Sequence, residues 1–576
     1  MKFIRMKTQL FLLLILFATP LAAQHQADYY VAVDGDDSNP GTFEEPWGTW
    51  QKAFATAQAG DTVYFRGGVW YPQEHSRGNV VCEIHVVDGI GHSGTKNDPI
   101  CFFAYPGETP ILDCSQVDMT GNNFNGGLDF YGTSNIHIKG LTVRNLTQPA
   151  SGELASGVGA SMCSNMTFEN LTVYNIGGRG MSYWGVAGHP EVPEIQSDTT
   201  RFINCDIYNC VDLLSEVPGN GSDAVKMDAE KDTYLYFYGC RAWGCGDDGF
   251  DVSGPGVTVF DHCWSFNHNL PGALDGNGFK FGANRGANAS IDENGQLILG
   301  TPLPGVRKIV KNCIAANNAG YGFYELGYTP YYPNNARVYN NVSYANGIGM
   351  ANAINGEYSG QNPSEYRNNI IYEPVQSDAA GRPLFLVVDD IYIESHNNWD
   401  YANSTVIGSL FWWQPTDSIV VTDDDFISLD ASQLSNPRKD DGSLPDITFM
   451  KLAAGSDLID AGTDVGIPYN GTAPDIGYAE YEPMTIIKNP INEDGSLLHC
   501  YPNPTKDIIK VCFNLNGVMP VNIKLINSKG EIVYSKTVQS DLLADFPIDL
   551  NAFSTGIYFL VLNYSNHTSS AKILKI

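Results

Sequence analysis

Four aspartates and one lysine occur close enough in the chain, and in a suitable order, to form a reactive site. Asp247, Asp248 and Asp251 belong to the segment GDDGFD, Asp223 precedes them, and Lys280 follows in the segment GNGFK. Carboxylate oxygens are the ligands of a hard cation, and this crowd of negative charges needs one. Because no His or Cys is interleaved with the aspartates, calcium fits the set better than zinc. The alternatives are that the aspartates only form turns between strands, or that calcium only stabilises the fold.

Lys280 is the candidate general base of this set. A nearby cation and partial burial lower the pKa of a lysine, which leaves enough neutral amine to accept a proton. The carbon-bound proton next to the carboxylate of a uronate sugar is a suitable target, because the cation neutralises that carboxylate and stabilises the developing charge. Loss of the C4 leaving group then completes a β-elimination. Away from the aspartates, a lysine on a solenoid surface is usually a solvated charge.

The elements that must position these residues show a common alignment. The segments DAVKM, GFDVS, GFKFG and GFYEL can be aligned so that one position holds Val225, Phe250, Phe279 and Phe323. One place later stand Lys226, Asp251, Lys280 and Tyr324, and two places earlier stand Asp223, Asp248, Asn277 and Tyr321. If the segments are successive parallel strands, aligned residues lie about 4.8 Å apart per strand. The alignment therefore predicts that the aspartates converge, with Lys280 one strand further along.

A second repeated position supports this stacking. Short segments such as KGLTV, NCDIY and NNVSY recur, and they place in one column Gly140, Asn170, Cys205, Cys240, Cys263, Cys313, Asn341, Asn369 and Asn398. The one long interval accommodates a polar insertion around 284–305. The separation between successive residues of this column is the length of one repeat. Repeats of that length, built of short strands rich in Val, Ile, Phe and Tyr, are typical of a solenoid. We therefore predict an all-β chain whose main part is a right-handed parallel β-helix.

The N-terminal residues 1–23 are predicted to be a secretory signal peptide. Lys2, Arg5 and Lys7 precede an apolar run and a stretch of small residues that ends at Ala23. No later segment has the roughly 18 consecutive apolar residues of a spanning helix, so we expect no transmembrane segment in the mature chain. The β-helix domain is expected over 28–488. Within it, Trp50–Gln58 is predicted to form a short amphipathic helix that caps the first coil.

The C-terminal region is predicted to be a small β-sandwich. A polar linker over 489–497 leads to alternating short strands with turn signals between them. The YPNP motif at Tyr501–Pro504, the segment Gly556–Tyr558 and the terminal Lys572–Ile576 resemble the C-terminal sorting domain of the type IX secretion system. The resemblance implies a sorting domain over 498–576 and the type IX secretion machinery as a partner. It also implies a protein that is released outside the cell or attached to its surface.

Charge and length limit the function further. The chain has 576 residues, a formal net charge of −31 at pH 7 and a pI near 4.5. It is too long for one compact core, which agrees with a solenoid and an appended domain. Such acidity argues against binding to nucleic acid. It does not exclude an acidic polysaccharide, because a bound cation and local Lys or Arg residues reverse the field at a site. We expect a monomer.

Twelve cysteines in an exported chain would ordinarily suggest disulfides. Residues stacked on parallel strands, such as Cys205 and Cys240, hold their Cβ atoms farther apart than the about 3.8 Å that a disulfide prefers. We therefore expect a ladder of buried thiols. Cys500 and Cys512, in the C-terminal region, could form a disulfide.

The acidic segments and the GNGFK motif, taken together within a β-helix, resemble polysaccharide lyase family 9, which includes pectate lyases and rhamnogalacturonan lyases. The likeness extends from the segment YYVAVDG to the segment APDIG. It implies a calcium-dependent lyase that cleaves galacturonate-containing pectic polysaccharide by β-elimination. By this resemblance Asp223, Asp247, Asp248 and Asp251 are calcium ligands and Lys280 is the Brønsted base. One departure concerns the residues after Asp223, where this chain has Ala-Val-Lys and pectate lyases of the family typically have Gly and a longer strand. The choice between homogalacturonan and rhamnogalacturonan therefore stays open.

Further residues could bind the substrate. Arg285, Arg307 and Arg337 could pair with uronate carboxylates, and Tyr324 could stack on a sugar ring, although a structural role is as natural for each. Two other functions are compatible with a β-helix: a non-catalytic glycan-binding surface protein or adhesin, and a glycoside hydrolase. A hydrolase needs a pair of carboxylates for acid and base catalysis, and the calcium cluster occupies the carboxylates available here.

Overall fold

The structure is a computed structural model. It describes residues 27–74, 80–117, 125–148, 154–185, 199–269, 275–292, 296–327, 331–354, 363–375, 385–387, 392–407, 410–414, 419–482, 497–501, 504–514, 520–527, 529, 531–539, 546–564 and 567–575. The chain forms two compact units, Met1–Tyr481 and Glu482–Ile576.

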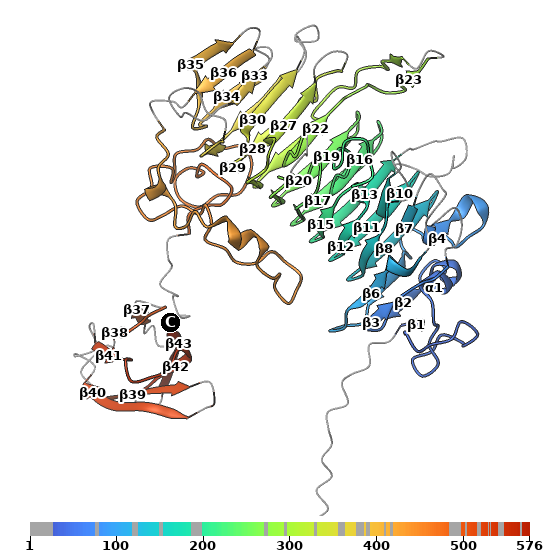
Figure 1. The fold of residues 1–576 in the computed structure, drawn as a ribbon. Coiled ribbons are helices and arrows are strands. Elements are labelled where there is room, and N and C mark those ends of the chain that lie inside the picture. Colours follow the sequence, from blue (N-terminus) through green and yellow to red (C-terminus); the bar gives the residue numbers. More distant parts are fainter. Residues whose placement is uncertain are drawn as a thin grey trace, which may run out of the picture. The chain divides into compact units, whose positions relative to one another are not determined.

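Three long sheets run the length of the first unit (Figure 1), and each coil of the chain adds one strand to each sheet in turn. We call them sheets A, B and C. Sheet A consists of β1 (Tyr29–Val31), β2 (Thr62–Phe65), β5 (Ile100–Ala104), β8 (Ser134–Lys139), β11 (Ser164–Glu169), β14 (Thr199–Ile203), β17 (Tyr234–Tyr238), β20 (Val257–Asp261), β25 (Lys308–Lys311), β28 (Arg337–Tyr339), β31 (Ser364–Arg367) and β34 (Tyr392–Ser395).

Sheet B consists of β3 (Gly68–Trp70), β6 (Pro110–Asp113), β9 (Thr142–Leu146), β12 (Thr172–Ile176), β15 (Asp206–Cys210), β18 (Arg241–Trp243), β21 (Trp264–Phe266), β26 (Ile314–Ala316), β29 (Val342–Tyr344) and β32 (Ile370–Tyr372). Sheet C consists of β4 (Val80–His85), β7 (Asn125–Tyr131), β10 (Ala155–Ser161), β13 (Gly178–Gly185), β16 (Val225–Ala229), β19 (Phe250–Ser253), β22 (Phe279–Gly282), β27 (Tyr321–Gly327), β30 (Ile348–Ile354) and β33 (Phe385–Val387), followed by β36 (Leu410–Gln414) and β35 (Asp400–Ile407).

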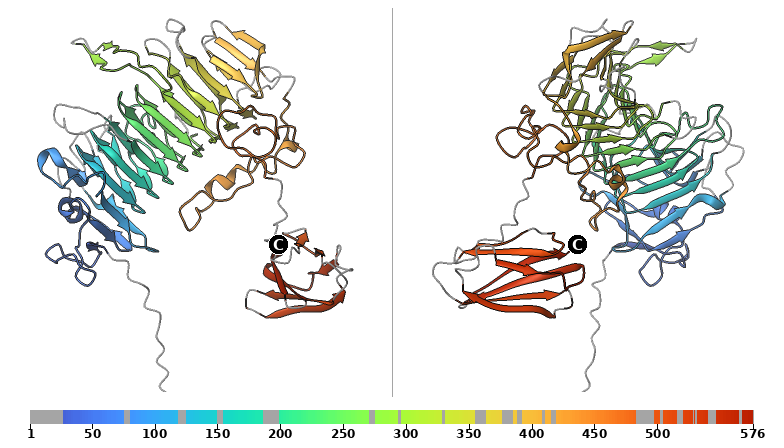
Figure 2. Two further views of the ribbon diagram at one scale, coloured as in Figure 1. Left: turned by 180° about the vertical axis from the view of Figure 1, so that it is seen from behind. Right: turned by 60° about the vertical axis from the view of Figure 1, so that its left-hand side comes forward.

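Neighbouring strands of the three sheets pair in parallel, except at the end of sheet C, where β33, β36 and β35 are antiparallel. The two further views in Figure 2 show the same stack of coils. The prediction of a parallel β-helix is confirmed. The polar insertion of the long coil contains a small hairpin of β23 (Ser290–Ile291) and β24 (Leu297–Ile298).

Aromatic stacking inside the solenoid fixes the strand register. Phe250 lies on Phe279 with ring centroids 5.0 Å apart, and Phe279 lies on Phe323 at the same separation. Val225 pairs with Phe250 in the same column. The register predicted from DAVKM, GFDVS, GFKFG and GFYEL is therefore confirmed.

The prediction of the second column was wrong by one residue in its first two coils and in its last coil. Backbone hydrogen bonds and strand pairing put Leu141 and Leu171, not Gly140 and Asn170, in line with Cys205. At the other end the column continues to Asn397 rather than Asn398, because the amide N–H of Asn369 donates to the Oδ1 of Asn397 at 3.0 Å. Gly140 and Asn170 belong to the preceding turn, where both have positive φ angles, 74° and 53°. That turn favours Gly and Asn, which explains the error.

The corrected column forms a buried ladder of thiols and amides. Cys205, Cys240, Cys263 and Cys313 are buried free cysteines, as predicted. From Cys313 onward the ladder consists of asparagines, each of which accepts a hydrogen bond from the backbone of the coil before it. Cys512 has no described side chain, so its pairing with Cys500 stays a prediction.

The first coil is capped by helix α1 (Trp50–Thr56), close to the predicted Trp50–Gln58. Its N-cap is Thr49, whose hydroxyl accepts a hydrogen bond from the amide of Lys52. Trp50 and Phe54 bury their rings against the solenoid interior, where Trp50 contacts Phe65 with centroids 4.8 Å apart. The helix thus covers the apolar end that a solenoid would otherwise expose. Short 3₁₀ helices lie at Val86–Asp88, Cys114–Gln116, Asp423–Asp425 and Ala431–Ser435.

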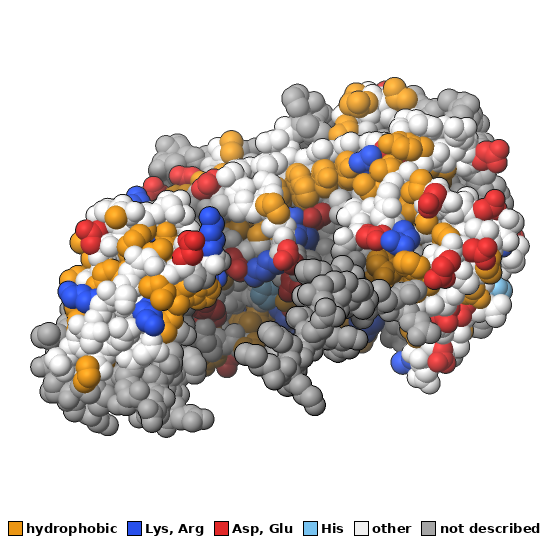
Figure 3. Space-filling model, turned by 90° about the horizontal axis from the view of Figure 1, so that it is seen from below, with side chains coloured by type: hydrophobic (Ala, Val, Ile, Leu, Met, Phe, Trp, Pro, Cys, Tyr) orange, Lys and Arg blue, Asp and Glu red, His pale blue; other side chains and the backbone are white. Residues whose placement is uncertain are grey.

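An irregular segment, 419–482, folds back over sheet B. Phe426, Phe449 and Ile476 pack with sheet B residues such as Phe266 and Val342 into a second apolar cluster. The segment therefore covers a row of apolar side chains that sheet B presents outward. Among the described residues no helix is long and apolar enough to cross a membrane. On the face drawn in Figure 3, Lys and Arg side chains lie among those of Asp and Glu.

The second unit contains two antiparallel sheets, as the predicted β-sandwich requires. One consists of β37 (Leu497–Tyr501), β38 (Ile508–Asn514) and β41 (Phe546–Asp549), and the other of β40 (Ile532–Gln539), β39 (Pro520–Asn527), β42 (Gly556–Tyr564) and β43 (His567–Lys575). The unit has an apolar core of its own, which includes Ile509, Ile523, Leu560 and Ile573.

Candidate active site

Successive coils bring the acidic residues together at the start of three sheet C strands. The amide of Ala224 donates to the carbonyl of Asp248 at 2.9 Å, and that of Gly249 donates to the carbonyl of Asn277 at 2.8 Å. Asp223, Asp248 and Asn277 are therefore stacked, as predicted.

A second column runs beside the first. Lys226 of β16 pairs with Asp251 of β19, and Asp251 pairs with Lys280 of β22. These side chains point outward, because the strand residues on either side of each of them are buried in the solenoid interior.

The carboxylates are crowded and largely withdrawn from solvent. Asp223 is 1% exposed, Asp248 0% and Asp251 6%, and an oxygen atom of each lies within 4.8 Å of the others. A second group overlaps the first, because Asp247, Asp248 and Asp275 also bring carboxylate oxygens within 4.8 Å of one another. Asp275 was not predicted; it lies two residues before the stacked Asn277, and its position next to the cluster comes from the turn into β22.

Two lysines contact the cluster from opposite sides. The Nζ of Lys280 lies 3.0 Å from Asp248 Oδ2, 3.6 Å from Asp251 Oδ2 and 3.2 Å from Asp275 Oδ2. The Nζ of Lys226 donates to Asp251 Oδ2 and lies 4.0 Å from Asp223 Oδ2. Lys226 stood in the aligned column of the sequence but was not recognised as a member of the site.

Burial and mutual repulsion perturb the carboxyl groups. Burial, reinforced by Asp251 and Asp248 and opposed by Lys226, raises the pKa of Asp223 to about 7. Burial together with Asp248 and Asp223 raises the pKa of Asp247 to about 9. Both carboxyl groups are therefore costly to ionise, because they are buried and lie beside other carboxylates.

The pKa of Lys280 is shifted in the opposite direction from the one expected beside a cation. Burial alone lowers the pKa of Lys280, but the carboxylates of Asp248 and Asp251 outweigh it and hold that pKa above its usual value. The reason is that without a cation the ammonium of Lys280 is itself a main counter-ion of these carboxylates.

The donor set fits a hard cation. Among the described residues, Asp223 Oδ1 and Asp247 Oδ1 are buried oxygens with no hydrogen-bond partner. Asp248 is held in place, because the backbone amide and Nδ2 of Asn277 both donate to its Oδ1, at 3.0 and 2.6 Å. Unpartnered buried carboxylate oxygens are costly unless they bind a cation or a proton, and oxygen ligands suit calcium.

The four predicted substrate contacts are divided between sheets. Tyr324 lies one strand beyond Lys280 in the same column and stacks on Tyr321 with centroids 4.6 Å apart. Arg285 follows the end of β22 in sheet C and forms an ion pair with Asp228, the next outward residue after Lys226 on β16.

The other two arginines are not brought to this face. Arg307 immediately precedes β25 and Arg337 begins β28, and both strands belong to sheet A. Arg307 donates to the carbonyl of Pro304, and Arg337 lies 3.3 Å from the carboxylate of Glu365. The sequence could not separate Arg307 from Arg285, because the insertion between them hides where sheet C ends and sheet A resumes.

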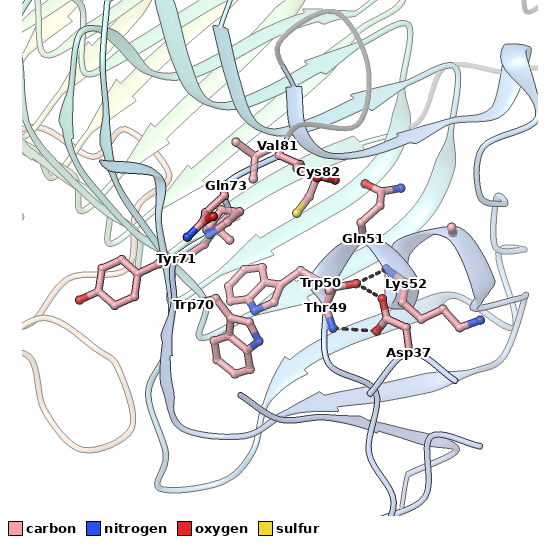
Figure 4. Close-up of a pocket in the computed structure, with 14 residues that line it drawn as sticks. Asp37, Thr49, Trp50, Gln51, Lys52, Trp70, Tyr71, Gln73, Val81 and Cys82 are labelled. Atoms are coloured by element: carbon pink, nitrogen blue, oxygen red, sulfur yellow. Dashed lines mark hydrogen bonds between the residues drawn. The ribbon is translucent and has the colours of Figure 1, made fainter. Parts of the chain in front are cut away.

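A cavity of about 620 Å³ lies at the capped end of the solenoid (Figure 4). Trp50 and Trp70 line it, and Thr49 at its edge donates to the carboxylate of Asp37 from both its amide and its hydroxyl. None of its lining residues belongs to the acidic cluster, so its position does not bear on the chemistry of Lys280.

The sequence of the first unit is similar to those of known pectate lyases. The chain is 28% identical over 466 residues to "Pectate lyase L" of Dickeya chrysanthemi, covering 78% of this chain and 90% of that protein. It is 25% identical to "Pectate lyase PEL9" of Emericella nidulans, covering 77% of this chain and 96% of that one.

Two solved structures are also similar to the first unit. The crystal structure of pectate lyase Pel9A matches with a TM-score of 0.57 and 25% identity, over 79% of this chain and 96% of that one. A rhamnogalacturonan lyase shares the fold, with a TM-score of 0.56 and 24% identity over 74% of this chain and 96% of that one.

Two family models match the two units. Residues 499–576 match the secretion system C-terminal sorting domain. Residues 29–369, more than half of the chain, match the model described as Pel9A-like, right handed beta helix region. The chain therefore belongs to the Pel9A-like family of right-handed β-helix proteins.

Proposed function

We propose that the protein is a calcium-dependent lyase that cleaves galacturonate-containing pectic polysaccharide by β-elimination, with Lys280 as the Brønsted base. Asp223, Asp247, Asp248 and Asp251 are the proposed calcium ligands. The family and its named relatives make the chain a polysaccharide lyase, and the C-terminal sorting domain makes it an exported one. Pectin as substrate, calcium and the role of Lys280 are the proposed part.

The observation that carries this proposal is the contact of one lysine with a cluster of buried carboxylates that still has unpartnered oxygens. Lys280 lies 3.0 Å from Asp248, while Asp223 Oδ1 and Asp247 Oδ1 have no partner among the described residues. When bound, calcium would neutralise the uronate carboxylate and so acidify the carbon-bound proton next to it.

The residues of the chain supply the remaining steps. Lys280, in its neutral form, takes the proton from C5 of the uronate, the electron pair forms the C4–C5 double bond, and the C4–O bond breaks. The departing oxygen takes up a proton and leaves as the new chain end. The side chain of Lys280 is only 16% exposed, which limits competition from water for its amine. Asp248 and Asp251 hold the ammonium form, so release of Lys280 for catalysis requires that these carboxylates find another counter-ion.

The test follows the ultraviolet absorbance of the unsaturated product on polygalacturonate and on rhamnogalacturonan, with calcium or with EDTA. We expect a calcium-dependent rise on one of the polymers, which would also choose the substrate. Lys280→Ala should lose at least about 100-fold in kcat/KM, the usual range for loss of a general base.

Lys226→Ala is the matched control. Lys226 contacts the same Asp251 from the other side but does not lie next to Asp275 or Asp248 in the described ion pairs. We expect a smaller loss than for Lys280→Ala. A reversed order would make Lys226 the base, and no absorbance rise with either polymer would contradict the proposed reaction. Calcium-dependent binding without cleavage would instead favour a glycan-binding surface protein.

A further inference from the structure

Arg179 continues the acidic column by one coil toward the N-terminus. The amide of Gly180 donates to the carbonyl of Asp223 at 3.0 Å, and Met181 of β13 pairs with Val225 of β16. Arg179 therefore occupies the position equivalent to Asp223, and adjacent positions in such a column lie about 4.8 Å apart. Burial raises the pKa of Asp223, and the positive charge of Arg179 opposes that rise although the two side chains form no ion pair.

The guanidinium of Arg179 is held by an aromatic ring and not by an acid. Its Cζ lies 5.5 Å from the ring centre of Trp184, which stands on the same strand. Three other arginines of the described residues pack on aromatic rings, and each of them also pairs with a carboxylate: Arg66 with Glu108, Arg144 with Asp113, and Arg241 with Asp206. Arg179 has neither an ion pair nor a side-chain hydrogen bond within the described part of the chain, and its Nε is buried without a partner.

The ring of Trp184 and the lack of an acidic partner among the described residues leave the guanidinium of Arg179 positioned, with free N–H groups, beside the acidic cluster. A ring face orients a guanidinium but offers no acceptor for its N–H groups. A planar carboxylate is the group that matches the fork with two parallel hydrogen bonds. Trp184 in turn pairs in register with Asp228, which forms an ion pair with Arg285. Arg179 and Trp184 both belong to β13, so they lie one coil to the N-terminal side of the Lys226–Asp251–Lys280 column.

We propose that Arg179, positioned by Trp184, binds the carboxylate of a uronate residue next to the one cleaved, on the N-terminal side of the acidic cluster. The identity of this ligand rests on the proposed function. The contact would let the protein recognise two neighbouring acidic sugars, one at the cluster and one at Arg179. It therefore favours a run of uronates over a polymer in which each uronate is followed by a neutral sugar.

The test separates binding from cleavage. Affinity for tetragalacturonate in calcium buffer is measured by calorimetry on protein that carries Lys280→Ala, with and without Arg179→Gln. A charge-assisted pair of hydrogen bonds is lost in the second variant, so we expect the affinity to fall about tenfold or more. Arg201→Gln removes an arginine of sheet A that donates to Thr199 O and Asn165 Oδ1, and it should leave the affinity unchanged.

Arg179→Lys gives a second measurement. It keeps the charge and loses the fork, so its affinity should fall between those of the parent and Arg179→Gln. Affinities of both Arg179 variants within twofold of the parent would overturn the inference, as would an equal loss in Arg201→Gln. Absence of an absorbance rise with the unmutated chain contradicts the proposed reaction, whereas tetragalacturonate binding that ignores Arg179 contradicts this inference alone.

Discussion

At the residue scale, two lysines and the proposed cation compete for the same carboxylate oxygen atoms. Asp251 Oδ2 contacts the ammonium of Lys226 and lies 3.6 Å from that of Lys280, while Asp248 Oδ2 contacts Lys280. Two lysines cannot balance five neighbouring aspartates, and burial together with repulsion between the carboxylates raises the pKa of Asp223 and of Asp247. A divalent cation would relieve the repulsion and loosen the hold on Lys280 at the same time.

Replacement of Asp223 should separate stability from cation binding. Asp223→Asn removes a buried charge whose pKa is raised to about 7, so at pH 8 the metal-free protein should become more stable, by about 1–4 kcal/mol. The same change removes a proposed ligand, so the gain in melting temperature on adding calcium should shrink. Thermal melting in EDTA and in calcium measures both effects. A variant that is less stable in EDTA and keeps the full calcium effect would contradict the assignment of Asp223.

The raised pKa values also predict how pH acts on calcium binding. At pH 5.5 the folded, metal-free protein holds protons on Asp223 (pKa about 7) and Asp247 (pKa about 9), whereas the unfolded carboxyl groups, with pKa near 3.8, do not. The folded state thus binds more protons, so this contribution to stability falls as pH rises from about 4 to about 9. Calcium must displace the same protons, so its affinity should rise about tenfold per pH unit for each proton displaced.

Melting temperatures at pH 5.5, 7 and 8.5 check this dependence. The difference between calcium and EDTA is the relevant quantity, because other buried groups contribute equally to both. A difference that stays constant across the range would mean that these carboxyl groups do not exchange protons for the cation.

At the element scale, sheet C positions the residues of the acidic cluster, and close packing between sheets C and B fixes the path of the chain before β19. A Cβ on Gly249 would lie 1.9 Å from Ser265 Oγ of sheet B, so only glycine allows the chain to pass there before β19. Asp248 precedes this glycine, and the position of its carboxylate depends on that close approach.

The repeated side-chain types explain how much of this arrangement could be predicted. The register of the four site segments followed from Phe250, Phe279 and Phe323, because large rings must stack inside a solenoid. Arg179 could have been found by counting one coil back from Asp223. The position of Arg337 could not be predicted, since strand length and turn shape decide which sheet carries a residue.

The asparagine ladder gives an element-scale prediction. Asn369 is fully buried, donates to Val338 O and Asn397 Oδ1, and accepts two hydrogen bonds from Asn341. Asn369→Ala leaves these groups unpaired and should cost about 2–4 kcal/mol. Thermal melting measures the loss, with Asn436→Ala as an exposed control in the same unit. Equal melting temperatures for the two variants would mean that the ladder does not hold the coils together.

At the scale of the whole molecule, the first unit ends in a segment without regular repeats that covers sheet B. Besides its apolar contacts, this segment supplies Arg438, which donates to Asp206 at 2.6 Å, and backbone carbonyls that accept from Arg241. Polar and apolar contacts along several coils thus tie residues far apart in sequence. The second unit has a separate core, and its sorting role requires no contribution to the active site.

Two truncations should therefore behave differently. A chain that starts after residue 23 and stops at residue 482 keeps the cover of sheet B, so its melting temperature and its activity on polygalacturonate should match those of the longer protein. A chain that stops at residue 418 exposes Phe266, Ile314 and Val342 of sheet B. It also loses Arg438, which donates to Asp206, and the carbonyls that accept hydrogen bonds from Arg241. Exposed apolar surface of this kind drives association, so this shorter chain should aggregate or bind a hydrophobic dye. If it melts at the same temperature and stays monomeric, the segment is not part of the solenoid's core, and the apolar row on sheet B is tolerated in water.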